Sequence, residues 1–258
     1  MKQKLQWLTM PIIIMAYVSA FVLIACSIYY GEYAALVTCL LYQKILVGLL
    51  GNQIAQHRYF SHRSFVTTKL RHYLLGFFSI LTATSPITYA SVHRHHHVHS
   101  DTDQDVHSPL KRFWYSALYW PFTELSNLKI KPATDLIRDP YLRWIHANVN
   151  VITTLIVLIL FLIGPIYGLG YLAAIGFNYL DSTLVRSALV HIRLPGSYRT
   201  YNTDDSSWNN QWLQLYHWSE GLHNNHHAFP NKYNTATCWP EFDLAGLCVH
   251  YFFKSKND

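Results

Sequence analysis

Residues 5–31 read LQWLTMPIIIMAYVSAFVLIACSIYYG, and this run of 27 residues without Asp, Glu, Lys, Arg or His decides the fold. A helix needs about 20 residues to cross the hydrocarbon core of a membrane. The run follows only Lys2 and Lys4 as charged residues, and it lacks the short apolar region and small-residue cleavage site of a secretory signal. We therefore expect a retained transmembrane helix over about residues 8–29.

The composition of the whole chain agrees with a membrane protein. Of its 258 residues, 51% are hydrophobic and 13% are charged, whereas charged residues make up about a quarter of a soluble domain. The formal net charge is +6, but no run of five or more Lys and Arg occurs. The positive charge therefore favours a basic side facing a membrane, and we expect no nucleic acid partner.

Two further segments are apolar enough to supply three more membrane spans. Residues 33–55 are interrupted only by Gln43, Lys44, Asn52 and Gln53, and they predict a second span. Residues 147–180 contain no charged residue, and as one helix they would be about 51 Å long, which is too long for one crossing. Glycines and Pro165 interrupt this segment near residue 164, so we expect a hairpin of two spans over about residues 147–166 and 168–190.

The distribution of Lys and Arg predicts the orientation of the four spans. The connecting turns at Gly31-Glu32 and at residues 164–170 contain no Lys or Arg, so the basic segments all belong to one side, which the positive-inside rule makes cytoplasmic. We expect both termini on that side of an inner (cytoplasmic) membrane. The basic residues of these segments are Lys2, Lys4, Arg58, Arg63, Lys69, Arg71, Lys111, Arg112, Lys129, Lys131, Arg138 and Arg143.

The uncharged segment 73–92 is long enough to span the membrane, but the histidines argue against it. If it crossed, His57 and His62 would be separated from His93 and His97 by the membrane. We expect this segment to lie in the interface, or to dip and return at the polar stretch 82–88. The prediction is an all-α membrane protein, a single domain over residues 1–258, with four spans, an interfacial helix and a cytoplasmic helical cap formed by residues 93–146 and 191–258.

The histidines form three clusters, at residues 57–62, 93–97 and 223–227. The second and third share the pattern His-x-x-His-His, in which residues four apart lie on one helix face and can bind one metal ion. His57 and His62 would point about 140° apart on a continuous α-helix, so the second span should end or bend there. Eight histidines exceed the four ligands of a zinc site, which implies two ions, although imidazole alone does not identify the metal.

With these clusters the chain resembles the membrane-bound fatty acid desaturases of the acyl-CoA Δ9 (stearoyl-CoA desaturase-like) family, in particular its bacterial type. The resemblance covers about residues 51–250. The segments that carry it are His57-Arg-Tyr-Phe-Ser-His-Arg63, Ser85-Pro-Ile87, His93-Arg-His-His-His97, Ser100-Asp-Thr-Asp-Gln-Asp-Val-His-Ser-Pro109 and Glu220-Gly-Leu-His-Asn-Asn-His-His-Ala-Phe-Pro230.

The resemblance implies a cytoplasmic site with two non-haem irons and nine histidine ligands, the ninth being His191. One iron would be held by His57, His62, His93, His97 and His226. The other would be held by His96, His191, His223 and His227. The family's Asn four residues before the ninth histidine is replaced here by Ser187. Since ligating imidazoles usually donate their other N–H to a carboxylate, we expect outer-shell roles for Asp101, Asp103, Asp105 and Glu220.

The resemblance also implies an oxidoreductase of fatty acid and lipid metabolism. Such an enzyme uses O2 and two electrons to introduce a cis double bond, here at Δ9, into a saturated acyl chain carried by CoA or a membrane lipid. The acyl tail would enter a cavity among the four spans. No segment of the chain resembles an electron-carrier domain, so a separate ferredoxin or cytochrome b5-type donor is expected. A hydroxylase of the same superfamily and a histidine-rich metal transporter remain alternatives.

Three minor predictions concern groups around these clusters. Lys44 and Asp181 lie at similar depths on two parallel spans, 13 and 10 residues before His57 and His191, and we expect them to form an ion pair. His99 and His107 are expected to be loop or head-group contacts. The aromatic cluster around Trp114 and Trp120 is expected to pack at the membrane interface.

Overall fold

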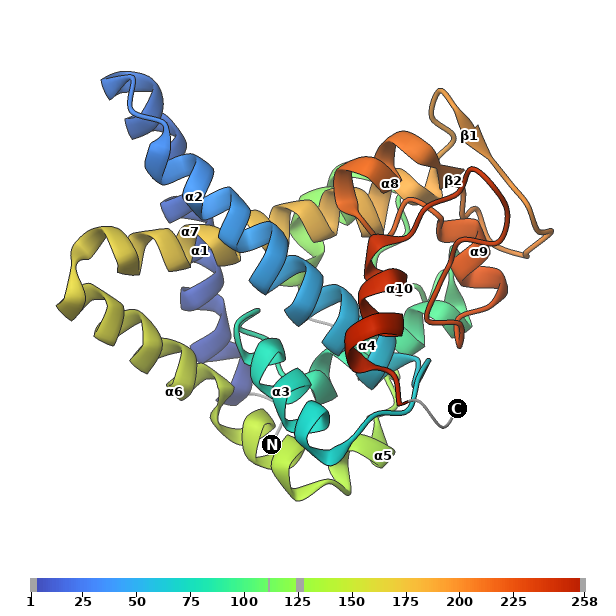
Figure 1. Ribbon diagram of the computed structural model, residues 1–258, viewed down its shortest axis with the longest axis horizontal. Helices are drawn as coiled ribbons and strands as arrows, with labels where there is room; N and C mark the ends of the chain where they lie inside the picture. Colours follow the sequence, from blue (N-terminus) through green and yellow to red (C-terminus); the bar gives the residue numbers. More distant parts are fainter. Residues whose placement is uncertain (1–3, 111, 124–127, 256–258) are drawn as a thin grey trace.

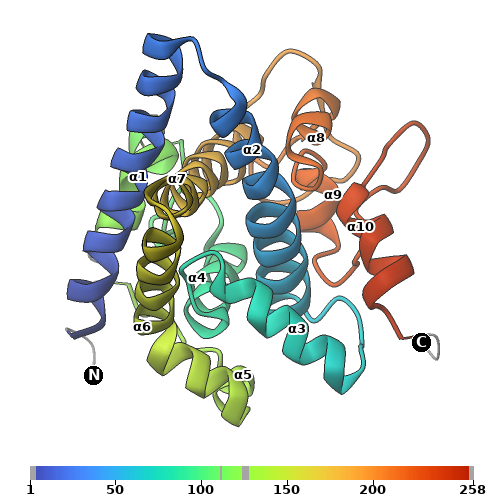
Figure 2. The same ribbon diagram turned by 60° about the vertical axis from the view of Figure 1, so that its left-hand side comes forward.

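The computed structural model describes residues 4–110, 112–123 and 128–255. Lys2 and Lys111, which the sequence places on the basic side, lie outside the described residues. Most of the chain is helical, and in Figure 2 the long helices run side by side while the orange and red part of the chain, toward the C-terminus, packs at one flank. The helices of the first half are α1 (Lys4–Tyr30), α2 (Ala34–Tyr42), the π-helix η1 (Gln43–Ser61), α3 (Lys69–Ile80), α4 (Pro86–His99), η2 (Tyr115–Tyr119) and η3 (Trp120–Phe122).

The second half contributes one long helical hairpin and a set of short elements. Its members are α5 (Thr134–Ile137), α6 (Pro140–Ile163), α7 (Pro165–Asp181), η4 (Ser182–Ala188), η5 (Leu189–His191), β1 (Ser197–Tyr198), β2 (Asn209–Asn210), α8 (Gln211–His217), α9 (His223–Ala228), α10 (Leu244–Cys248) and η6 (Val249–Phe253). The fold is therefore nearly all-α. The small antiparallel pair β1–β2 departs from the prediction and closes the loop that follows His191.

Three helices of the described chain are long and apolar enough to cross a membrane: 10–30, 34–61 and 140–163. The break expected in the third uncharged segment occurs at Gly164, between α6 and α7. Helix α7 has 17 residues before its continuation widens into η4, and it is therefore shorter than the usual span. The count of four spans stays a prediction.

Helix α7 lies against α1 at very close range. At Gly176 an added Cβ would lie 2.2 Å from the carbonyl oxygen of Ala16, so only glycine permits this approach. Small residues at helix crossings are typical of membrane proteins, because van der Waals contact replaces the hydrophobic effect there. Gly170, on the same helix, has no neighbour within 4 Å of such a Cβ. The requirement for glycine therefore holds at Gly176 and not at Gly170.

The segment 73–92 folds as two helices rather than one. Helix α3 ends at Ile80, a polar turn follows, and α4 begins at Pro86, with the Ser85 side chain accepting a hydrogen bond from the backbone N–H of Thr88. Both helices pack against η1, and Leu75 and Ala90 belong to the same buried core as Ile54. In Figure 1, α3 lies beside the lower part of η1. The dip-and-return interpretation agrees with this arrangement.

The expected ion pair between Lys44 and Asp181 is confirmed. The Lys44 Nζ lies 3.2 Å from Oδ2 of Asp181, and both side chains are largely buried. Nε2 of His217 lies 3.4 Å from the same oxygen, and the ammonium also lies 3.9 Å from the centre of the Tyr216 ring. The pair therefore joins η1, α7 and α8 near the point where α7 widens.

Candidate metal centre

Five histidines from three helices form a first group. His57 lies near the end of η1 and His62 follows that helix, His93 and His97 lie on α4, and His226 lies on α9. Their ring nitrogens lie within 4.8 Å of one another. Nε2 of His93 is 2.8 Å from Nε2 of His62 and 3.1 Å from that of His97, and Nε2 of His226 is 3.0 Å from that of His97.

The first cluster is brought together by a widened helix turn. Backbone bonding in η1 follows the i to i+5 pattern of a π-helix, and the N–H of His62 donates to the carbonyl of His57 at 3.2 Å. This wider turn brings residues five apart to neighbouring positions, where the two rings lie 4.9 Å apart. The helix ends at Ser61, where an end or bend was expected, but the widened turn is what brings the two rings together.

Four histidines form a second group beside the first. His96 lies on α4, His191 ends η5, and His223 and His227 lie on α9. Nε2 of His223 lies 3.1 Å from Nε2 of both His191 and His227. The rings of His97 and His227 are 4.4 Å apart, so the two groups adjoin. The structure thus divides all nine predicted histidines into the two sets expected from the sequence.

The spacing of the nitrogens suits a metal ion in each group. Imidazole nitrogens bind a divalent ion at about 2.1 Å, and two of them at right angles around it are about 3.0 Å apart. The Nε2 distances of 2.8–3.1 Å match this value. Neutral imidazoles that point their lone pairs at one another would repel unless a cation lies between them. The donor set therefore fits the implied metal ions.

Carboxylates lie behind five of the nine rings. Nδ1 of His96 lies 2.9 Å from Asp105, that of His191 lies 3.2 Å from Asp101, and that of His227 lies 2.6 Å from Asp205. The buried Glu220 serves both groups, because one of its oxygens lies 2.9 Å from Nδ1 of His57 and the other 3.5 Å from Nδ1 of His223. The three aspartate contacts are hydrogen bonds, and each directs the Nε2 lone pair of its ring toward the centre of the group.

Three of the four carboxylates expected in outer-shell roles lie against imidazole rings, and the roles themselves stay a prediction. Asp101, Asp105 and Glu220 each contact an imidazole. Asp103 lies in the same loop with its side chain exposed. Sequence reasoning missed Asp205, which lies 18 residues before His223 and belongs to no spaced pattern. Its role depends on the fold of the loop between β1 and β2, where Ser207 N–H also donates to it at 2.9 Å.

Burial disfavours the charged form of several of these rings, among them His97 and His227. Burial lowers the pKa of the His97 ring well below its ordinary value, and neighbouring imidazoles, His227 foremost, lower it further. Burial lowers the pKa of His227 to about 4, although Asp205 acts in the opposite direction. Burial alone would raise the pKa of Asp101, but hydrogen bonds from His191 and Ser206 hold it below its usual range. At neutral pH, a neutral His227 ring therefore faces a charged Asp205 carboxylate.

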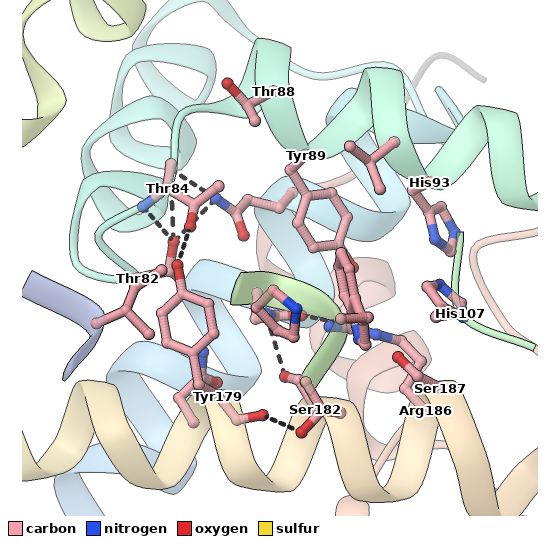
Figure 3. A pocket seen from close by; sticks show the side chains of 18 of the residues that line it. Thr82, Thr84, Thr88, Tyr89, His93, His107, Tyr179, Ser182, Arg186 and Ser187 are labelled. Carbon is pink, nitrogen blue, oxygen red and sulfur yellow. Dashed lines mark hydrogen bonds between the residues drawn. The ribbon is translucent and has the colours of Figure 1, made fainter. Parts of the chain in front are cut away.

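A cavity of about 250 Å³ opens beside the histidines. In Figure 3, His93 and His107 lie toward one end of it, and Thr84 and Tyr179 lie toward the other. Tyr179 and Thr84 are hydrogen-bonded at 2.6 Å, and Thr183 donates to a backbone carbonyl at 2.9 Å. Because these hydroxyls are satisfied within the protein, the wall presents mainly their carbon atoms to the cavity.

Three residues of this cavity refine the sequence interpretation. Ser187 is buried and lines the cavity wall. His107, expected in a loop or at a head group, is buried, and its ring lies 4.3 Å from that of His96. Trp120 lines the cavity and lies 5.0 Å from the His107 ring, so it is part of the site rather than of an interfacial belt. Trp114 is exposed, as the belt interpretation predicts.

Apolar helices that carry two adjoining histidine groups define the class: a helical membrane protein whose histidine clusters suit metal binding. The family model described as fatty acid desaturase matches residues 34–243, so the chain belongs to the fatty acid desaturase family. It is a desaturase enzyme, an oxidoreductase of lipid metabolism.

Relatives with curated names agree with the family. The chain is 32% identical over 234 residues to Delta-9 acyl-lipid desaturase 2 of Arabidopsis thaliana, and this match covers 87% of this chain and 73% of that protein. It is 33% identical over 211 residues to sn-1 stearoyl-lipid 9-desaturase of Anabaena variabilis, and this match covers 79% of this chain and 75% of the relative. Acyl-CoA C20 Delta5-desaturase of Anemone leveillei is 29% identical over 213 residues, covering 79% and 66%.

Proposed function

We propose that this desaturase introduces a cis Δ9 double bond into a saturated acyl chain, using O2 and two electrons at two irons held by the nine histidines. The observation that supports this most directly is the pair of adjoining imidazole groups beside a cavity whose wall includes His93. When bound, iron supplies the oxidising power that no side chain has, since the hydrogens of a saturated methylene are not acidic.

The residues of the chain position the irons and the substrate. Asp101, Asp105, Asp205 and Glu220 hold the imidazole rings in one orientation, so the ligand set is organised before metal and substrate bind. The acyl tail enters the cavity, and its reacting carbons lie at the His93 end. The Tyr179–Thr84 hydrogen bond closes the other end and limits the length of tail that fits. Ser187, four residues before His191, lines the cavity, and in the proposed site its hydroxyl would bind a water molecule.

The acyl carrier is proposed from the relatives. The names of two of the three relatives above specify lipid-bound acyl groups and position 9, whereas the third is an acyl-CoA desaturase. We propose a lipid-bound acyl group as substrate, in an integral membrane enzyme whose site faces the cytoplasm. Stearoyl-lipid and stearoyl-CoA tested side by side with the purified enzyme distinguish the two carriers.

The proposed function is tested by expression in a host that lacks its own desaturase, followed by mass spectrometry that locates the new double bond. We expect a cis Δ9 product from the unchanged chain and about two irons per chain. His93→Ala should abolish the product and lower the iron content, whereas His250→Ala, which alters an exposed ring outside both groups, should retain both. A hydroxylated fatty acid as the main product would support the hydroxylase alternative.

A further inference from the structure

A second hollow, of about 520 Å³, borders the segment that follows His62 of the first histidine group. Its walls are residues 63–66 and 231–234, with Lys254 at the rim. Its basic lining residues are Arg63, Lys232 and Lys254, and none of the described residues that line it is acidic. Arg63 pairs with Asp135, but Asp135 is also paired with Arg94. The two guanidiniums and the one carboxylate together therefore keep a net positive charge.

The rim of this hollow is held by buried contacts. The Arg58 guanidinium is buried and donates to the backbone carbonyl of Tyr233 and, at 3.0 Å, to Asp243. The backbone N–H of Ser255 donates to the carbonyl of Val66 at 2.9 Å. In Figures 1 and 2 the chain that follows η1 accordingly passes beside the C-terminal helix. The cations therefore project from a defined surface.

The hollow is joined through the chain to the first histidine group. One wall begins at Arg63, the residue after His62, and the other begins at Asn231, four residues after His227. Nε2 of His62 in turn lies 2.8 Å from that of His93. A redox centre bound in the hollow would therefore lie close, through a short covalent path, to the proposed irons.

The hollow is also distinct from the acyl cavity. The two share no lining residue, and the acyl cavity lies between α4, η3 and α7–η4. An anionic acyl head group would need to lie at the mouth of the acyl cavity. The cations of the hollow therefore match a partner that brings something other than the acyl chain.

We propose that this basic hollow is the docking site of a small acidic protein that carries one electron at a time. The inference rests on the proposed function, which requires two electrons per turnover. In that reaction one –CH2–CH2– unit, one O2, two electrons and two protons give one –CH=CH– unit and two waters. Two reduced carriers each lose one electron. Opposite charge on the two surfaces would orient the carrier and accelerate its association.

The test uses the detergent-solubilised holoenzyme with reduced plant-type ferredoxin as the varied electron donor. Lys232→Glu should raise the KM for ferredoxin about tenfold and weaken ferredoxin binding, measured by titration calorimetry, by a similar factor. The dependence of the rate on ionic strength should become shallower, because one screened attraction is lost. The KM for the acyl substrate should not change. Lys131→Glu is the matched control, since Lys131 is also exposed but lies outside the hollow.

Two results would overturn the inference. If Lys232→Glu leaves both ferredoxin binding and the KM for ferredoxin unchanged, the hollow is excluded as the docking site. A rise in the KM for the acyl substrate alone would assign the hollow to an anionic acyl carrier. A small reductant, dithionite-reduced methyl viologen, distinguishes failure of the docking site from failure of the proposed function. Product formed with this mediator supports the desaturation reaction itself. Lys232→Glu should not alter the rate measured with the mediator.

Discussion

At the residue scale, the site depends on which ring nitrogen of each histidine carries the proton. Carboxylates that accept from Nδ1 leave the Nε2 lone pair free for a metal, and this explains why acidic residues with buried, charged carboxylates surround the two groups. Such outer partners typically contribute a factor of 10–100 to metal affinity. Asp205, 2.6 Å from His227, belongs to this set although no sequence motif contains it.

We predict that Asp205→Asn lowers iron affinity by about 10–100-fold while the fold is retained. The reason is that a neutral amide replaces the negatively charged carboxylate that accepts the hydrogen bond of the His227 ring. Iron retained against a competing chelator measures this. Asp204→Asn changes the exposed neighbouring residue and should behave like the unchanged protein. Equal iron retention in both variants would show that Asp205 does not support a metal ligand.

A second residue-scale prediction concerns Asp135, which pairs with Arg94 and Arg63. Burial alone would raise the pKa of Asp135, but hydrogen bonds from the two guanidiniums hold it well below its usual range. A carboxyl whose pKa is lowered by folding stabilises the protein above its unfolded pKa of about 3.9, and this contribution is lost as the pH falls further.

Asp135→Asn should therefore reduce the free energy of unfolding by about 1 kcal/mol at pH 7, since the pair is partly exposed. The difference from the unchanged protein should stay constant between pH 8 and 5 and shrink below about pH 4. Thermal unfolding in detergent across this range measures it, with Glu32→Gln as an exposed acidic control. A difference that grows on acidification would contradict the assigned sign.

At the element scale, the widened helices place the chemistry. Both η1 and η4 are π-helices, and they lead to His57 and His62 and to His191, respectively. An ordinary α-helix would turn the first two rings away from each other. Next to η4, the Lys44–Asp181 pair ties the two helices together, so the two widened segments are held in a fixed relation.

For this pair we predict non-additive effects on stability. Asp181→Asn should cost about 3 kcal/mol, because it leaves the largely buried Lys44 ammonium without an anion. Lys44→Met should cost less, since His217 still lies 3.4 Å from Asp181. The double substitution should be less damaging than the sum of the two. Unfolding measured for all four proteins completes the cycle, and additive losses would mean that the contact contributes no coupling.

At the scale of the whole molecule, both histidine groups require the first and second clusters on the same side of the membrane. The loop at Glu32 should lie on the opposite side of the membrane, since α2 and η1 separate this loop from the first histidine cluster. Exposed positions close to each site are available at Val66, Val98 and Glu32. Sidedness is therefore directly testable by labelling.

We predict that single cysteines replacing Val66 and Val98 react with a membrane-impermeant maleimide from one side of intact cells or inverted vesicles. A cysteine at Glu32 should react only from the other side. The background protein carries serine at the exposed Cys26 and Cys238. Labelling of Val66→Cys and Val98→Cys from opposite sides would make a shared metal centre impossible.

The sequence alone determined the features that depend on local pattern. Long uncharged runs predict helices that cross a membrane, and i, i+4 histidines predict chelating pairs, because hydrophobic length and helix periodicity are properties of neighbouring residues. The Lys44–Asp181 pair was also predictable, since two charges at equal depth in an apolar layer have few alternatives to pairing.

Only the tertiary structure decided what depends on distant segments. The contact of Asp205 with His227, the place of Trp120 in the cavity wall and the basic hollow between residues 63–66 and 231–234 all join segments that have no shared motif. The π-helical turn at His57 was likewise not visible in the sequence, because the choice between an ended and a widened helix depends on what packs around it. Local pattern specifies elements, whereas packing between elements far apart in the chain specifies the contacts that complete the site.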